Sequence, residues 1–351
     1  MRIAQVAPPL ESVPPQRYGG TERVVATLTE ELVRRGHDVT LFAAGTSRTS
    51  ARLVPVVPNG VWHQRPPYKD FGPFWSITVG RVLRQVGDFD VIHSHLDYAG
   101  FALARAAPPP VLSTLHGRLD LPELGPVFEE FDEVPLVSIS NAQREPVPRA
   151  NWIDTVYHGI DVDEYTFRPE PGHYLAFLGR ISADKGVDAA IRIAEQAGVP
   201  LRIAARMPLR HKENPEVRRD WTYYENEVQP LLQGPDVALI GQVGGSQKDA
   251  FLGNALALLF PINWPEPFGL VMIEALATGT PVLALARGSV PEIITHGETG
   301  FVGDSEADLV EAVARAPFID RRRCRQEVEQ RFSAAAMTEQ YERVYARLVG
   351  G

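Results

Sequence analysis

The chain has almost no cysteine: Cys324 is the only one in 351 residues. A single thiol excludes an internal disulfide framework and any zinc or iron–sulfur site that needs several cysteines. We therefore expect a reducing, cytoplasmic compartment. Long apolar runs are also lacking, because the longest, residues 255–262, falls well short of the ~20 residues that span a bilayer. Residues 1–7 run into Pro8-Pro9 before a signal sequence could form, so no targeting segment is expected, although association with a membrane surface stays open.

Positive charge is not in excess either. The 35 Lys and Arg residues are outnumbered by 44 Asp and Glu, which gives a net charge of −9. A nucleic-acid-binding protein is normally basic, so nucleic acid is not an expected partner. The sequence also contains no G-x-G-x-x-G and no Walker A pattern, which removes the best evidence for a dehydrogenase or an NTPase.

Short apolar runs alternate with helical patterns along the chain. Strands are expected over residues 2–7, 38–42, 90–95, 111–115 and 136–139, and again over 174–178, 201–204, 237–240, 257–260 and 281–284. Helices are expected from about residue 21 and from about residue 185, and over 269–277, 305–314 and 334–348, with Ser305 and Asp308 forming a capping box. Such alternation predicts parallel sheets built from βαβ units.

The pattern restarts after residues 166–172, whose composition is that of a linker. The fold class predicted is α/β, with two Rossmann-like doubly wound domains that face each other across a cleft. Their expected bounds are 1–165 and 166–330, and residues 331–351 contain a last amphipathic helix. A ligand is expected in the cleft, at the carboxyl ends of the strands.

The segment from Glu266 to Glu274 is the most informative motif. Pro267 suits a first helical turn, and the backbone of Phe268 to Val271 would present free N–H groups, which bind phosphate well at the start of a helix. Glu274 would lie about 9 Å beyond Phe268 along the helix axis, which is roughly the separation of a diphosphate from its ribose. A capped helix with two solvated glutamates is the alternative.

Two further loops follow the first strands of the two halves. Arg180 and Lys185 come directly after the first strand of the second half, where they could clamp a diphosphate. Surface charge is the alternative. Gly19 and Gly20 follow the first strand of the chain, where glycines let the backbone approach a ligand, although a tight turn explains them equally well.

Together these motifs resemble a known family. In chain order they are Gly19-Gly20, Leu115-His116-Gly117, Ser138-Ile139-Ser140, His158-Gly159-Ile160-Asp161, Arg180 with Lys185, the two glutamates seven residues apart, residues 274–282, Pro291-Glu292 and residues 297–301. This set is similar to that of the family-4 retaining glycosyltransferases of the GT-B fold. The resemblance covers essentially the whole chain and is strongest between residues 241 and 303. It implies that residues 1–165 form an acceptor-side domain and that residues 166–330 form a nucleotide-sugar donor domain. It also implies that the C-terminal helix in residues 331–351 packs back towards the first domain.

The resemblance implies a site. Arg180 and Lys185 would hold the donor diphosphate, and Glu274 the ribose. Glu266 and the backbone of Phe268, Gly269, Leu270 and Val271 would hold the sugar and its phosphate. His116 would lie near the anomeric centre, and Gly19 and Gly20 would close over the phosphates. The nucleotide base would lie near Gly241 and Val243. Family members often carry Asn where this chain has His158, so His158 receives no role.

The expected function is the metal-independent transfer of a hexose, with UDP-glucose as the favoured donor, to a small-molecule, glycan or lipid hydroxyl. No cofactor is expected beyond the nucleotide-sugar substrate. A sugar-nucleotide epimerase or phosphorolytic enzyme of the same architecture is one alternative, and a non-catalytic nucleotide-sugar-binding protein is another.

Three other features have plainer interpretations. His93 and His95 point the same way from a strand and could suit a metal, but only Asp97 offers a third ligand. Residues 321–325 are expected to form a solvated helix face, with lipid docking or an activated thiol as alternatives. Residues 221–225 are expected to pack against the fold, with a lid over the nucleotide as the second interpretation.

Overall fold

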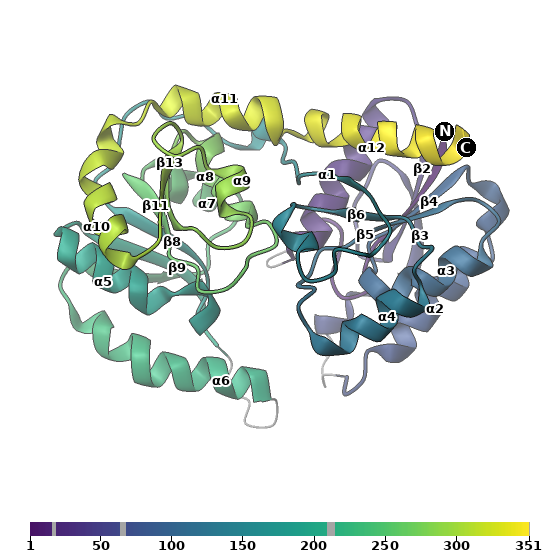
Figure 1. Ribbon diagram of the computed structural model, residues 1–351, viewed down its shortest axis with the longest axis horizontal. Coiled ribbons are helices and arrows are strands. Elements are labelled where there is room, and N and C mark those ends of the chain that lie inside the picture. Colours follow the sequence, from purple (N-terminus) through teal and green to yellow (C-terminus); the bar gives the residue numbers. More distant parts are fainter. Residues whose placement is uncertain (16–18, 64–67, 209–214, 351) are drawn as a thin grey trace. The chain divides into compact units, whose positions relative to one another are not determined.

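The computed structural model describes residues 1–15, 19–63, 68–208 and 215–350. Residues 16–18, which precede the Gly19-Gly20 pair, lie outside the described residues. The chain divides into two compact units (Figure 1). Unit 1 comprises Met1–Ile160 and Arg331–Gly351, and unit 2 comprises Asp161–Gln330.

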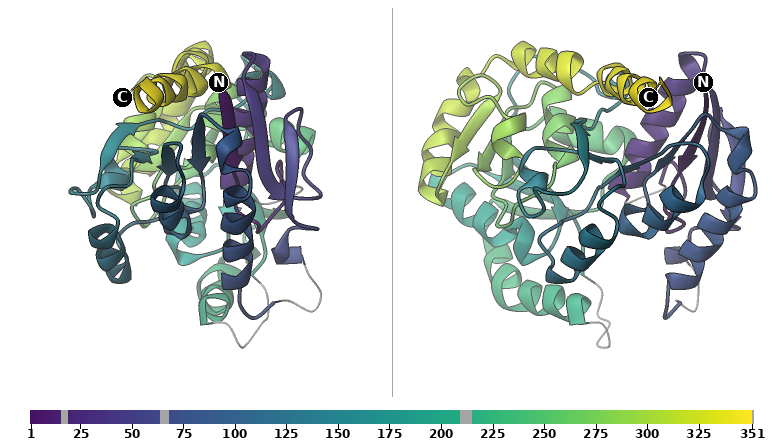
Figure 2. Two further views of the ribbon diagram at one scale, coloured as in Figure 1. Left: turned by 90° about the vertical axis from the view of Figure 1, so that its right-hand side faces the viewer. Right: turned by 45° about the vertical axis from the view of Figure 1, so that its right-hand side comes forward.

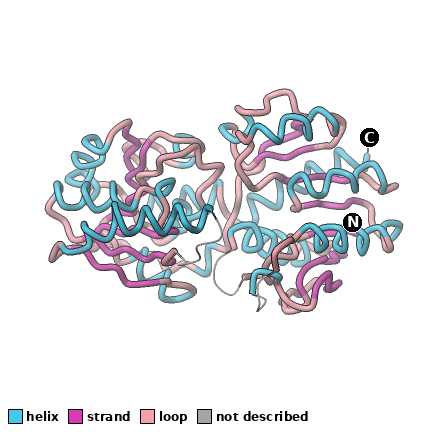
Figure 3. The backbone as a smooth tube through the Cα atoms, turned by 90° about the horizontal axis from the view of Figure 1, so that it is seen from below, coloured by secondary structure: helices cyan, strands magenta, loops and turns pink. Residues whose placement is uncertain are grey.

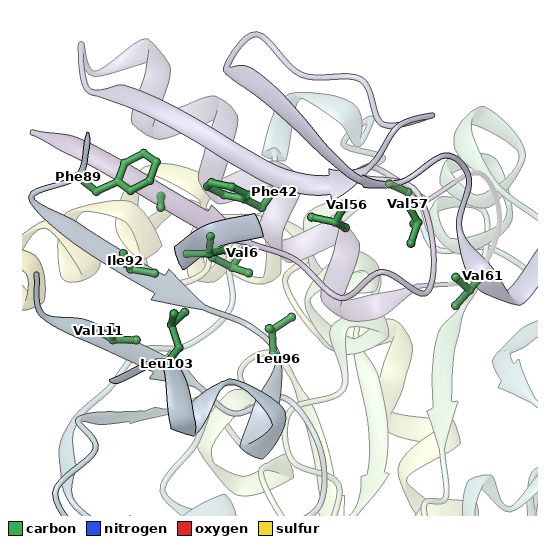
Figure 4. Packing of buried hydrophobic residues seen from close by; sticks show 13 residues of the cluster. Val6, Phe42, Val56, Val57, Val61, Phe89, Ile92, Leu96, Leu103 and Val111 are labelled. Carbon is green, nitrogen blue, oxygen red and sulfur yellow. The ribbon is translucent and has the colours of Figure 1, made fainter. Parts of the chain in front are cut away.

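Unit 1 contains a seven-stranded parallel sheet in the order β3-β2-β1-β4-β5-β6-β7. Its strands are β1 (Arg2–Val6), β2 (Asp38–Ala44), β3 (Arg52–Val57), β4 (Val91–Ser94), β5 (Val111–Thr114), β6 (Leu136–Ser138) and β7 (Trp152–Thr155). The central strands are buried along almost their whole length, because helices cover both faces of such a sheet (Figure 3). Figure 4 shows one of the resulting cores, where Val6, Phe42 and Ile92 meet Phe89 and Leu103.

The helices of unit 1 are α1 (Gly20–Arg34), α2 (Gly72–Leu83), α3 (Phe101–Ala106), α4 (Gly125–Glu130) and α12 (Ala334–Gly350). The C-terminal helix α12 lies beside α1 (Figure 2). Arg35, just past the end of α1, donates to Glu342 of α12 at 2.8 Å, and Tyr341 and Tyr345 of α12 are fully buried. The return of the C-terminal helix to the first half of the chain is thereby confirmed.

Unit 2 contains a six-stranded parallel sheet in the order β10-β9-β8-β11-β12-β13. Its strands are β8 (Leu175–Arg180), β9 (Leu201–Arg206), β10 (Val237–Gly241), β11 (Ala257–Phe260), β12 (Val282–Leu285) and β13 (Gly300–Gly303). Its helices are α5 (Val187–Ala197), α6 (Pro215–Tyr223), α7 (Gly245–Gly253), α8 (Leu270–Ala277), α9 (Val290–Ile293), α10 (Glu306–Arg315) and α11 (Arg321–Arg331). These two sheets confirm the predicted α/β class and its two doubly wound domains.

Each sheet has a topological switch point, where the strand order reverses. In unit 1 it lies between β1 and β4, and in unit 2 between β8 and β11. Ligands of open α/β sheets bind beyond the carboxyl ends of the strands at such a point. In unit 2 this position is occupied by the loop after β8, which carries Lys185, and by the loop after β11, which carries Glu266.

Most predicted elements are present within a residue or two, including the capping box of Ser305 and Asp308 at α10. Strands β3, β7 and β13 were not predicted. β7 is only half-buried and ends its sheet, and β3, also at an edge, contains Pro55. Both features weaken the apolar pattern by which buried strands are recognised. β13 begins at Gly300 and is only four residues long.

Residues 321–325 were expected to form a solvated helix face, but this prediction is wrong for two of them, which are buried. Arg321 is 5% exposed and Cys324 is fully buried. The guanidinium of Arg321 donates to the carbonyl oxygens of Arg168, Gly253 and Ala255 and to Thr280 Oγ1, at 2.7–3.1 Å. Its N–H donors therefore make four hydrogen bonds, three of them to carbonyl oxygens, and burial lowers its pKa to about 10. Burial also raises the pKa of Cys324 to about 12, which argues against an activated thiol.

None of the helices in the described part of the chain is both long enough and apolar enough to span a bilayer.

Candidate functional site

Lys185 and Glu266 meet at the switch point of unit 2. Lys185 ends a 3₁₀ turn, Ala183–Lys185, directly after β8, and its ammonium forms an ion pair with Glu266 Oε2. Trp264 lies over the Lys185 ammonium, 5.4 Å from its ring centroid, and its Nε1 donates to the same carboxylate oxygen at 3.1 Å. Both charged side chains are largely buried. A cation held at this edge of the sheet can attract the phosphates of a nucleotide.

Arg180 is the last residue of β8, and the 3₁₀ turn that ends at Lys185 follows it closely in the chain. Its Nη1 is 3.9 Å from Asp220 Oδ2, which makes a loose ion pair. Its Nε is buried and makes no hydrogen bond to any described residue. An N–H of a guanidinium that is removed from water without an acceptor is costly to leave unpaired. Arg180 therefore retains donor capacity for an anionic ligand.

The helix that follows Glu266 does not extend back to Pro267. α8 starts at Leu270, so Pro267 and Phe268 precede it rather than forming its first turn. The chain turns at Gly269, whose φ of +80° is one that residues with a side chain rarely adopt. Helical spacing from Phe268 to Glu274 therefore does not apply, and the expected separation of 9 Å along the axis is not supported.

The start of α8 nevertheless has the groups expected of a phosphate site. The first N–H groups of a helix have no partner within it and lie at the positive end of its dipole. Those of Leu270 and Val271 occupy these positions. Phe268 is 2% exposed, and its carbonyl accepts a hydrogen bond from Ser289 Oγ at 2.8 Å. The loop between Glu266 and the helix is thus held by packing and by hydrogen bonds.

Glu274 lies in the second turn of α8 and is buried in an ion pair that the sequence did not reveal. Lys248 of α7 donates to Glu274 Oε1 at 2.5 Å, and Tyr165 Oη donates to the same oxygen at 3.1 Å. The side chains of Lys248 and Glu274 are 10% and 7% exposed. This pairing contradicts the alternative of a solvated glutamate.

Gly241 and Val243, expected near the nucleotide base, lie at the same edge of the sheet as Arg180. Gly241 ends β10, which pairs with β9, and β9 pairs with β8 in parallel. Val243 lies in the short loop that leads to α7. The same α7 carries Lys248, so this loop connects to the partner of Glu274.

Gly19 and Gly20 belong to unit 1 and lie at the start of α1. Gly20 is the first residue of the helix, and Gly19 precedes it. A Cβ atom at Gly19 would lie 2.8 Å from Glu22 Oε2 and 2.9 Å from Pro15 Cβ, so a larger residue does not fit there. Burial raises the pKa of Glu22 to about 7.

His116, also in unit 1, lies in the loop after β5 at the edge where β4 ends. The backbone of this loop is fixed from both sides. The N–H of His116 donates to Asp97 Oδ1 at 2.8 Å, and Gln143 Nε2 donates to the carbonyls of Leu115 and Gly117, both at 2.9 Å. Asp97 adopts φ +48°, an uncommon value for a residue with a side chain.

The ring of His116 lies between two other histidines. It stacks on His158 with 5.2 Å between ring centroids, and its Nε2 is 2.9 Å from His95 Nδ1. Burial lowers the pKa of His116 to about 3, so its ring is neutral near pH 7. The other ring nitrogen, Nδ1, is buried and has no hydrogen-bond partner among the described residues.

His93 and His95 are engaged in hydrogen bonds to other side chains. His93 contacts Tyr345 Oη and Thr114 Oγ1, both at 2.7 Å, and His95 contacts Gln5 Oε1 at 2.8 Å. Within residues 1–15, 19–63, 68–208 and 215–350, no three His, Cys, Asp or Glu side chains are grouped so that they could hold a metal ion.

In unit 2 the structure brings Lys185 to Glu266, with Arg180 at the end of β8 and Gly269 directly before α8. Sequence reasoning noticed Asp97 only as a possible third metal ligand, and it missed Lys248, Tyr165, Gln143 and Gln5. Each acts through a partner distant in the sequence, so no local spacing could have indicated it. His95 was noticed only as a potential metal ligand.

Comparison with known proteins identifies the class of this enzyme. The family model described as Glycosyltransferase Family 4 matches residues 18–164, and that described as Glycosyl transferases group 1 matches residues 163–331. The chain belongs to the family-4 glycosyltransferases. It therefore transfers a sugar from a nucleotide sugar.

Relatives are similar over nearly their whole length. A glycogen synthase of Mycobacterium tuberculosis is 26% identical over 86% of this chain and 81% of its own. The structure of AviGT4, a glycosyltransferase involved in avilamycin A biosynthesis, is 25% identical, with a TM-score of 0.73 over 100% of this chain and 98% of that one. The structure of HepE of Anabaena in complex with UDP-glucose has a TM-score of 0.74 at 16% identity, over 99% of this chain and 100% of its own.

Proposed function

We propose that the enzyme transfers glucose from UDP-glucose to a hydroxyl group with retention of the anomeric configuration and without a divalent metal. The observation that carries this proposal is the arrangement at the switch point of unit 2. There Arg180 ends β8 and Lys185 follows it, and the start of α8 follows β11 with Glu266 in the loop between them.

The diphosphate is the group that these residues suit best. Arg180 presents a planar set of donors and Lys185 a compact charge, and together they can balance the charge of a departing nucleoside diphosphate. The N–H groups of Leu270 and Val271 add partial positive charge. Because these groups already supply positive charge, a metal ion is not needed to neutralise the leaving group.

Glu274 is proposed to bind the ribose. Lys248 and Tyr165 both contact its Oε1, which fixes the carboxylate in one orientation before the nucleotide arrives. A carboxylate is a strong acceptor for sugar hydroxyls. The loop from Gly241 to Val243, which leads into the helix of Lys248, is proposed to contact the base. HepE, whose structure contains UDP-glucose, has the same fold, which is consistent with a uridine nucleotide here.

Glu266 is proposed to bind hydroxyls of the donor sugar rather than to act as a nucleophile. Double displacement needs a carboxylate on the face of the sugar opposite the leaving phosphate. Glu266 is instead paired with Lys185, the proposed phosphate ligand, and so lies on the leaving-group side. Same-face attack follows, in which the departing diphosphate accepts the proton of the incoming hydroxyl. His116, Gly19 and Gly20 are proposed to contact the bound donor, with His116 near the anomeric carbon.

A donor screen tests this proposal. Thermal shifts are measured with UDP, GDP, ADP and dTDP and with their glucose conjugates, and UDP release is then followed with UDP-glucose. A ligand at 100 times its dissociation constant adds about 2.7 kcal/mol of stability, which is readable as a shift of a few degrees. UDP-glucose should give the largest shift. A larger shift with GDP or ADP conjugates would contradict the proposed donor.

A further inference from the structure

A chain of buried side chains connects helix α12 to His116 through the interior of unit 1. Gln5 of β1 is fully buried, and its Nε2 donates to Tyr345 Oη at 3.0 Å. Its Oε1 is 2.8 Å from His95 Nε2, and His95 Nδ1 is 2.9 Å from His116 Nε2. The proposed function uses only the last member of this chain, so the role of the others is open.

The direction of each hydrogen bond follows from the amide of Gln5. Its Nε2 donates to Tyr345, so its Oε1 must accept, and His95 must carry its proton on Nε2. A neutral imidazole has one donor and one acceptor nitrogen. His95 Nδ1 is therefore the acceptor, and the proton between the two rings belongs to His116 Nε2. This leaves Nδ1 of His116 as an unprotonated acceptor.

His95 can act in this way only while it is neutral, because an imidazolium has no acceptor nitrogen. Burial is the main cause that keeps the pKa of His95 well below its usual value, and the neighbouring rings of His93, His116 and His158 lower it further. Burial also keeps the pKa of His93 well below its usual value, and the ring of His116 lowers it further. His93 contacts the same Tyr345 hydroxyl as Gln5 does.

The reverse arrangement is less favourable. If the Gln5 amide were turned round, every proton in the chain would move to the other nitrogen, and His116 would carry its proton on Nδ1. That nitrogen is buried and has no partner among the described residues. Buried N–H groups without an acceptor are rarer in native structures than unpaired acceptors. The lack of a described partner at Nδ1 of His116 therefore favours the arrangement in which His116 carries its proton on Nε2.

We propose that Gln5 and His95 are positioning residues that hold His116 as its Nε2–H tautomer, so that its Nδ1 accepts a hydrogen bond from a hydroxyl of the bound substrate. Asp97 and Gln143 fix the backbone of the His116 loop, and the stack on His158 fixes the plane of the ring. The tautomer of His116 is then the one property of the ring that these contacts leave open. Gln5 determines it through the hydrogen bonds from Gln5 to His95 and from His95 to His116. The substrate contact rests on the proposed function, whereas the tautomer does not.

The tautomer is measured directly by long-range ¹H–¹⁵N NMR of the full chain labelled with ¹⁵N-histidine. The His116 resonances are assigned from the spectrum of His116→Gln. The expected result, in the ligand-free protein, is a protonated Nε2 and an unprotonated Nδ1 on His116. A His116 ring protonated mainly on Nδ1 overturns the proposal. Because no substrate is present, this result is independent of whether UDP-glucose is the donor.

A second measurement separates positioning from simple structural support. Gln5→Met retains the volume of the side chain but removes its hydrogen bonds, so His116 should become a mixture of tautomers and kcat/KM should fall about 3–10-fold, the scale of one hydrogen bond. Thr78→Val is the matched control, because it removes a buried hydroxyl of unit 1 that bonds within α2, to the carbonyl of Phe74. It should leave the His116 tautomer and the activity unchanged.

A fall in activity for Gln5→Met with an unchanged His116 tautomer would show a merely structural role and overturn the proposal. If Gln5→Met does not fold, Tyr345→Phe replaces it, because this variant removes the acceptor that orients the Gln5 amide and should also give a mixture of tautomers. A Tyr345→Phe protein with the wild-type tautomer would count against the proposal.

Discussion

Lys185 and Glu266, which are separated by 81 positions in the sequence, form an ion pair where β8 and β11 end. Trp264 covers the Lys185 ammonium and donates to the same Glu266 oxygen, so the pair is held on two sides. In the proposed reaction Lys185 must share its charge between this carboxylate and a diphosphate. The pair therefore links sugar binding at Glu266 to phosphate binding at Lys185.

Removing either cation at the end of β8 should slow the reaction strongly. Lys185→Ala and Arg180→Ala are each expected to lower kcat by about 10²–10³, the scale of losing one preorganised electrostatic contact to a transition state. UDP release from UDP-glucose measures the effect. Arg192→Ala is the control, because Arg192 on α5 pairs with Asp188 and Glu306 rather than with Glu266. Equal rates for Lys185→Ala and Arg192→Ala would remove Lys185 from the site.

Glu274→Gln should weaken the binding of UDP by about 1.5–3 kcal/mol, the usual loss for a hydrogen bond to a charged group. Isothermal titration calorimetry measures the affinity. The amide retains an oxygen for Lys248, whereas Glu274→Ala would leave that buried ammonium without its carboxylate and destabilise unit 2. Glu195→Gln, on the exposed side of α5, is the control. Unchanged affinity in Glu274→Gln would exclude a contact with the ribose.

Activity should persist in excess EDTA. Arg180, Lys185 and the start of α8 supply positive charge to the leaving diphosphate, so no divalent cation is required for that purpose. Initial rates are compared before and after dialysis against EDTA, with and without added manganese or magnesium. Loss of activity in EDTA and its recovery with manganese would contradict the expectation.

Unit 1 should become less stable as the pH falls from about 7.5 to about 5. Burial depresses the pKa of His93, His95, His116 and His158 in the folded state. The unfolded chain therefore binds protons below about pH 6.5 that the folded chain does not, and the stability present above that pH is lost as it falls. Each of these histidines lowers the free energy of unfolding by about 2 kcal/mol at pH 5.

Two carboxyl groups act in the opposite direction. Burial raises the pKa of Asp97 to about 6 and that of Glu22 to about 7, so the folded state takes up these protons first as the pH falls. Each of these two carboxyl groups adds about 1–3 kcal/mol to the free energy of unfolding at pH 5. Together they offset less than the loss that the four histidines cause. Urea unfolding at the two pH values tests the balance. A free energy of unfolding that is equal or larger at pH 5 would be inconsistent with neutral, buried histidines.

The sequence predicted the fold class because buried parallel strands appear as apolar runs separated by helical patterns. It missed the edge strand β7, whose residues are only half-buried, and it wrongly expected Pro267 and Phe268 to belong to the first turn of α8. Gly269 explains that error, because a left-handed turn at this residue separates Phe268 from α8.

The candidate site was predictable only where its chemistry lies in local motifs. Arg180, Lys185, Glu266 and Glu274 occur in two short segments that a resemblance can identify. Lys248, Tyr165 and Gln5 have no such signal, because each is defined by a partner that the fold brings near. Arg321 shows the same limit, since a cluster of arginines gives no indication that one of them is buried among carbonyl groups.

The anomeric configuration of the first product tests the central claim most directly. When UDP-α-glucose is hydrolysed slowly by the enzyme, with water as the acceptor, ¹H NMR can record the glucose before mutarotation. Same-face attack assisted by Arg180 and Lys185 predicts α-glucose as the first product, with one UDP released per glucose and no glucosyl group attached to Glu266 by mass spectrometry. Initial formation of β-glucose, or a trapped glucosyl–Glu266 adduct, would contradict the account.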